Sequence, residues 1–171
     1  MGFNQRDEIW NATWKSYYET YFQEILSEKL VFRWQRFDEL SKVIIALTAS
    51  GSALSGWALW NQADFKVVWA MLAGIGAILA VFHKSLEVSH KISDWVSSRS
   101  QFCLLRFDYE ILLNKMRFDP DFSVEECSED LDDLLRRFAE SYQKIKVDAF
   151  LTGRLRNKAQ DELDTFIQNK Q

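Results

Sequence analysis

Residues 43–60 read VIIALTASGSALSGWALW, and residues 67–82 read VVWAMLAGIGAILAVF. The forty residues 43–82 carry two charges, Asp64 and Lys66, and both lie in the short link between the apolar stretches. At about 1.5 Å rise per residue, a helix over 43–60 is roughly 27 Å long, close to the apolar thickness of a bilayer. The second stretch is shorter and needs a flanking residue or local thinning. The pattern predicts an all-α membrane protein with a two-helix transmembrane hairpin.

The alternative is a soluble helical protein that buries this hairpin on all sides. Neither stretch has the polar face that a helix of a soluble bundle normally shows, which argues against that alternative. Basic residues set the expected orientation, because positive charge stays on the cytoplasmic side. They flank the stretches on both outer sides: Lys29, Arg33, Arg36 and Lys42 precede the first, and Lys84, Lys91 and Arg99 follow the second. Both termini are therefore expected in the cytoplasm.

Outside the hairpin, the composition is that of an ordinary, slightly acidic surface. The whole chain has 171 residues and a formal net charge of -4. Without a basic bias, duplex nucleic acid is an unlikely partner. The cysteines Cys103 and Cys127 have no CxxC partner and no metal-ligand spacing, so we expect both to be packing residues.

The rest of the chain is expected to be helical, because Pro120 is its only proline. Residues 1–42 are predicted to form an aromatic-rich cytoplasmic or interfacial helix that continues into the first apolar stretch. Beyond the transmembrane hairpin of residues 43–82, residues 83–171 are predicted to form a cytoplasmic helical domain. Its first helix carries apolar or aromatic residues spaced by seven, as in a coiled-coil seam: Val88, Trp95, Phe102, Tyr109 and Met116.

A chain reversal is predicted after Phe118, because Asp119, Pro120 and Asp121 favour a turn. Ser123 and Glu126 then have the spacing of a capping box. The next helix has an apolar stripe and should fold back antiparallel on the seam, as an antiparallel helical bundle or coiled coil.

Two arginines, Arg99 and Arg106, interrupt the row of residues beside the seam. Two interpretations stay open. The arginines extend toward solvent or pair with acids of a neighbouring helix, or they line a cavity that binds an anion.

No catalytic motif stands out. The chain has no glycine-rich phosphate loop and no GxSxG elbow, and its two histidines, His83 and His90, have no second pair at metal-ligand spacing. We expect no enzyme, no cofactor and no metal site.

Small residues four apart in both apolar stretches favour close helix packing. Gly51, Gly56, Gly74 and Gly76 are the candidates for that packing. The contacts form either between the two arms or between copies of the chain. The hydroxyls of Ser52 and Ser55 either bond back to their own helix or, in an oligomer, line a pore. We predict the pore-lining role.

An uncharged hairpin with Asp64 and Lys66 at its tip, followed by a long helix from Lys84, resembles the SLATT family of bacterial two-transmembrane effectors. The resemblance is architectural and covers most of the chain. It implies a homo-oligomeric pore-former that breaches the bacterial inner membrane in antiphage immunity.

The resemblance also implies a trigger, which is a cyclic nucleotide or a sensor protein linked to a nucleotidyltransferase. The candidate residues for binding such a ligand are Arg99 and Arg106. The main alternative is a non-conducting, membrane-anchored helical scaffold that recruits a cytoplasmic partner.

Overall fold

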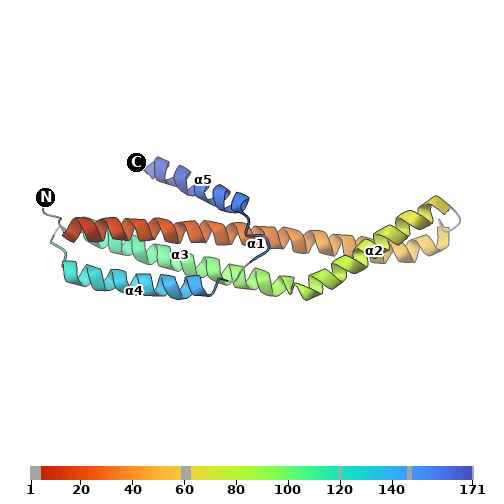
Figure 1. The fold of residues 1–171 in the computed structure, drawn as a ribbon, viewed down its shortest axis with the longest axis horizontal. Helices are drawn as coiled ribbons and strands as arrows, with labels where there is room; N and C mark the ends of the chain where they lie inside the picture. Colours follow the sequence, from red (N-terminus) through yellow and green to blue (C-terminus); the bar gives the residue numbers. More distant parts are fainter. Residues whose placement is uncertain (1–4, 59–62, 120, 146–147, 171) are drawn as a thin grey trace. The chain divides into compact units, whose positions relative to one another are not determined.

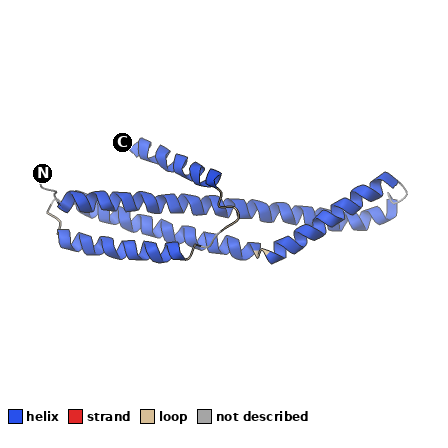
Figure 2. Ribbon diagram, in the orientation of Figure 1, coloured by secondary structure: helices blue, strands red, loops and turns tan. Residues whose placement is uncertain are grey.

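The computed structural model describes residues 5–58, 63–119, 121–145 and 148–170, with side chains for 5–48, 67, 70–71, 74–119, 121–145 and 148–169. All regular structure in these ranges is helical (Figures 1 and 2). The helices are α1 (Gln5–Ala58), α2 (Ala63–Ser85), α3 (Val88–Phe118), α4 (Val124–Gln143) and α5 (Gly153–Lys170). The prediction of a helical chain is therefore confirmed.

The membrane prediction is wrong. Over the described residues, no helix combines the length and the apolar character that a bilayer crossing requires. This finding overturns the transmembrane helices predicted over 43–60 and 67–82, the membrane fold class, and the placement in the bacterial inner membrane with cytoplasmic termini.

The prediction failed because a stretch without charged residues is not necessarily apolar enough to cross a bilayer. Six of the eighteen positions in 43–60 are Ser, Thr or Gly, which gain little on transfer to hydrocarbon. The second stretch has only sixteen residues. α1 is a single helix of 54 residues that begins at Gln5, so the helix before the first stretch continues into it, as the sequence predicted.

The chain divides into two compact units. The bundle comprises residues 1–31 and 94–171, and the hairpin unit comprises residues 32–93. Both α1 and α3 contribute residues to each unit.

Within the bundle, α4 runs antiparallel to α3, as predicted. Lys115 near the end of α3 pairs with Asp130 at 3.0 Å, and Asp108 farther back pairs with Arg137 at 2.8 Å. α3 ends at Phe118, and the Ser123 side chain accepts a hydrogen bond from the backbone N–H of Glu126 at the start of α4. The turn and the helix cap that the sequence predicted are therefore confirmed.

The core of the bundle is built on the heptad seam of α3. Phe102 and Tyr109 are fully buried, and Trp95 and Met116 are each 5% exposed. Residues from α1 and α4 pack on the same cluster, among them Tyr17, Cys127 and Leu131. The buried Cys127 is a packing residue, as expected.

In the hairpin unit, α1 and α2 run antiparallel. Thr48 of α1 lies against Gly76 of α2, and Asp38, earlier in α1, contacts His83, later in α2. Glu87, between α2 and α3, has a φ of 46°, a left-handed conformation that breaks the helix there.

Candidate functional site

The most unusual surface of the hairpin unit is a row of exposed apolar side chains on α2. Met71, Ile75, Ile78 and Phe82 are spaced by four, three and four residues and are 50–66% exposed. This is the spacing of a coiled-coil seam, which normally inserts into a partner helix. We call these four residues the α2 seam.

A second row lies on α1. Leu40, Val43 and Leu47 are spaced by three and four residues and are 54–65% exposed. We call them the α1 seam. Isolated exposed apolar residues are common on proteins, but two rows at helical spacing in one unit mark an interaction surface.

The two seams point away from the contact between α1 and α2. An α-helix turns by about 100° per residue, so the α1 seam lies roughly 140–180° around the helix from Asp38 and about 80–140° from Thr48. Those two residues contact α2. By the same geometry, the α2 seam lies roughly 80–160° around α2 from Gly76 and His83. The hairpin unit therefore presents two apolar seams that are turned away from the contact between its helices.

Between the helices, a polar contact holds one end of the hairpin. Asp38 Oδ1 lies 2.7 Å from His83 Nε2, and Lys42 Nζ donates to Asp38 Oδ2 at 2.6 Å. The hydrogen bond from Lys42 lowers the pKa of Asp38, burial opposes that change, and the bond with His83 adds to the lowering. Asp38 therefore stays ionised and fixes the positions of both partners.

The predicted packing residues Gly74 and Gly76 have different environments. Gly74 is exposed, with no atom within 4 Å of where a Cβ would be, so it leaves room on the surface near the α2 seam. Gly76 is buried, and a Cβ there would lie 2.5 Å from Thr48 Oγ1. The Thr48 hydroxyl is bonded back to the carbonyls of Ile44 and Ile45. Gly76 thus allows close approach within the hairpin.

The other candidates lie outside the described side chains. α1 includes Gly51, Ser52, Ser55 and Gly56 in its backbone, but the structure describes no side-chain environment for them. The pore-lining role of Ser52 and Ser55 stays a prediction.

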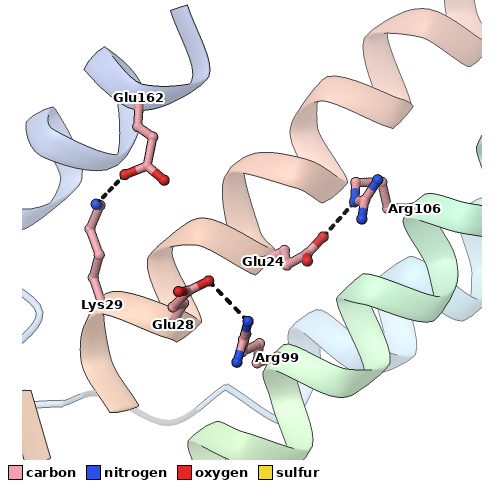
Figure 3. Close-up of polar contacts among 6 residues, drawn as sticks. All are labelled: Glu24, Glu28, Lys29, Arg99, Arg106 and Glu162. Atoms are coloured by element: carbon pink, nitrogen blue, oxygen red, sulfur yellow. Dashed lines mark hydrogen bonds and ion pairs between the residues drawn. The ribbon is translucent and has the colours of Figure 1, made fainter. Parts of the chain in front are cut away.

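The two predicted ligand-binding arginines both lie in the bundle and face glutamates of α1 (Figure 3). Arg106 Nε donates to Glu24 Oε2 at 2.6 Å, with the two side chains only 18% and 11% exposed. Arg99 lies 3.2 Å from Glu28, and both side chains are about half exposed. These pairs show that α1 and α3 are antiparallel.

Burial by itself lowers the pKa of Arg106, but the hydrogen bond and charge of Glu24 outweigh burial and hold the pKa above its ordinary value. The guanidinium also lies over the rings of Tyr21 and Phe107. Arg106 is therefore a charged, enclosed contact between α1 and α3. That Arg99 and Arg106 bind a ligand stays a prediction.

On the other side of α1, Lys29 pairs with Glu162 of α5 (Figure 3). The rings of Tyr21 and Phe166 lie 4.7 Å apart. α5 is therefore antiparallel to α1 as well.

Sequence reasoning missed both seams. The signal was present, because the spacing of four, three and four can be read directly from residues 71–82. The uniform apolar character of that stretch was interpreted as contact with lipid, which hid the periodicity.

Comparison with protein-family models, curated proteins and solved structures finds no match for this chain.

Proposed function

We propose that this protein is a non-catalytic helical scaffold whose hairpin units associate head to tail, copy to copy, into a closed ring. The observation that carries the proposal is the pair of exposed apolar seams on one hairpin. A two-fold dimer that packs one seam on its own copy would leave the other seam in water. A head-to-tail contact brings the α2 seam of one copy onto the α1 seam of the next, and such contacts close into rings when the rotation permits.

The size of the seams supports this assembly. Together with Val67 and Val81, which are 58% and 66% exposed, they offer on the order of 1,000 Å² of apolar surface per contact. That is about the area a specific interface needs. The exposed Gly74 leaves room beside the α2 seam for a helix of the neighbouring copy.

The proposal retains the predicted homo-oligomer and takes the scaffold alternative without its membrane anchor. The α1 and α2 seams are sufficient to assemble a scaffold, and this assembly does not require a pore. The antiphage effector role implied by the SLATT resemblance stays a prediction.

Sedimentation velocity on the full chain without detergent tests the assembly. The wild type should sediment as a single species of several 20.1 kDa chains. Met71→Glu and Leu47→Glu should each reduce the size of the sedimenting species, because each places a carboxylate in a seam that the contact would dehydrate. Ile111→Glu is the matched control, since Ile111 is as exposed as Met71, at 66%, but lies in the bundle. It should leave the assembly intact.

Mixing the two seam variants separates contacts between an α1 seam and an α2 seam from two-fold contacts between like seams. A Met71→Glu copy retains its α1 seam, and a Leu47→Glu copy retains its α2 seam, so an equimolar mixture should form a heterodimer and stop there. Homodimers of Leu47→Glu alone would contradict the head-to-tail arrangement, and growth with concentration would contradict a closed ring. A monomeric wild type that floats with phosphatidylglycerol vesicles would show that lipid covers the seams instead.

A further inference from the structure

The bundle contains a cavity of about 520 Å³ between α1, α3 and α5. This volume is within the range of small-molecule sites, roughly 300–1,000 Å³. All its lining residues belong to the bundle, so the cavity is formed within one compact unit. It is separate from both seams of the hairpin unit.

Aromatic rings form the α1 wall of this cavity. Trp10, Trp14 and Tyr18 recur at steps of four, which places them on one face of the helix. Trp14 and Tyr18 stack with centroids 5.3 Å apart, and Trp10 meets Trp14 edge-on at 5.8 Å. None of the three is fully buried. A wall of accessible indole and phenol rings favours a flat aromatic ligand, which gains by stacking and by burial of its own faces.

Polar groups on α3 define the opposite wall. Arg117, Asn114 and Glu110 line it at steps of three and four. Glu110 lies 3.8 Å from Arg106, but Arg106 already pairs with Glu24, so the Glu110 end of this wall stays acidic and an anion is favoured at the Arg117 end. Among the residues that the structure describes, neither Arg117 nor Asn114 has a side-chain hydrogen bond or ion pair. The cavity thus has an uncompensated guanidinium, which can hold a carboxylate or phosphate with two parallel hydrogen bonds.

We propose that this cavity binds a flat aromatic anion: a ring system stacked on Trp10 and edge-on to Trp14, with its acidic group on Arg117 and a ring substituent hydrogen-bonded to Asn114. Neither the rings nor the cation alone defines this class. An aliphatic anion lacks the stacking surface, and a neutral aromatic leaves the guanidinium without a partner. The site does not depend on the proposed ring assembly.

Two probes test whether the cavity binds aromatic anions and whether it prefers a carboxylate or a phosphate. Isothermal titration of the full chain with 2-naphthoate reports an aromatic carboxylate, and titration with adenosine 5′-monophosphate reports an aromatic phosphate. Adenosine is the control for adenosine 5′-monophosphate, because it lacks the charged phosphate. Cyclohexanecarboxylate is the control for 2-naphthoate, because it lacks the aromatic ring. We expect at least one aromatic anion to bind, and at least 10-fold tighter than its matched control.

Variants then assign binding to the cavity. Arg117→Gln and Trp10→Leu should each weaken binding at least 10-fold while the helical circular dichroism stays unchanged, because Arg117 is exposed and Trp10 lies at the cavity wall. Arg156→Gln, an exposed arginine on α5 outside the cavity lining, should leave binding unchanged. Absence of binding to both aromatic anions, or binding that survives both cavity variants, would overturn the proposal.

Discussion

The contact between Arg106 and Glu24 should be a main determinant of bundle stability. We predict that Arg106→Met destabilises the protein by about 2–3 kcal/mol. Methionine keeps much of the apolar volume but leaves the Glu24 carboxylate, 11% exposed, without its 2.6 Å partner. Removing one partner of a fully buried pair costs about 3–5 kcal/mol, and the remaining exposure of this pair reduces the cost.

Chemical denaturation of the full chain, followed by far-UV circular dichroism, measures the change. Arg99→Met is the matched control, because Arg99 links the same two helices to Glu28 at 3.2 Å but both side chains are about half exposed. It should change the free energy of unfolding by no more than about 0.5 kcal/mol.

A double-mutant cycle separates the lost pair from lost packing. The double variant Glu24→Met with Arg106→Met removes both charges of this pair and leaves only Glu110, whose side chain is 41% exposed to water, so it should recover most of the stability that Arg106→Met loses. An Arg106→Met variant within about 0.5 kcal/mol of wild type, or an Arg99→Met variant that is equally destabilised, would refute this role of the buried pair.

Three further predictions use the same denaturation assay. Gly76→Ala should cost about 1–3 kcal/mol, because its Cβ would lie 2.5 Å from Thr48 Oγ1. Adding Thr48→Ala should recover part of the cost, because it removes Oγ1 and Cγ2 but keeps the Cβ at 3.0 Å; a double variant no more stable than Gly76→Ala would refute the clash. Trp95→Phe should cost about 1.5–3 kcal/mol, since Trp95 Nε1 donates to the buried Asp148 carboxylate at 2.8 Å; an unchanged stability would show that the bond contributes little. Burial raises the pKa of Tyr109 to about 12, so the stability it contributes is present below its ordinary pKa of 10.0 and is lost as pH rises toward 12. Tyr109→Phe should therefore lose less stability than the wild type over that pH range, and parallel pH profiles would contradict the assignment.

Local signals in the sequence predicted much of the bundle. Pro120 and its aspartate neighbours end α3 at Phe118, and Ser123 caps α4. These outcomes depend on residues within one helical turn of each other, so short-range backbone chemistry decides them. The seven-residue spacing from Trp95 to Met116 likewise identified side chains that are buried.

The candidate site was less accessible to prediction. Spacing predicted that Gly76 takes part in helix packing, but only the structure shows Thr48 as its neighbour. Arg106 was left open between an acid on another helix and a ligand, and its contact with Glu24 spans 82 positions of the chain. Composition does not encode such pairings, because many glutamates could have satisfied the same arginine.

By itself, the sequence determined that this chain is helical, where α3 ends and α4 begins, and which face of α3 forms the core. Those properties follow from periodicity and from helix-breaking or capping residues, which act locally. Only the tertiary structure showed how the described part of the charge-poor residues 43–82 packs. Low charge does not say whether a surface faces water, a neighbouring helix or another chain. The antiparallel contact of Thr48 with Gly76 sets one face of α1 against α2 and leaves the two apolar seams exposed.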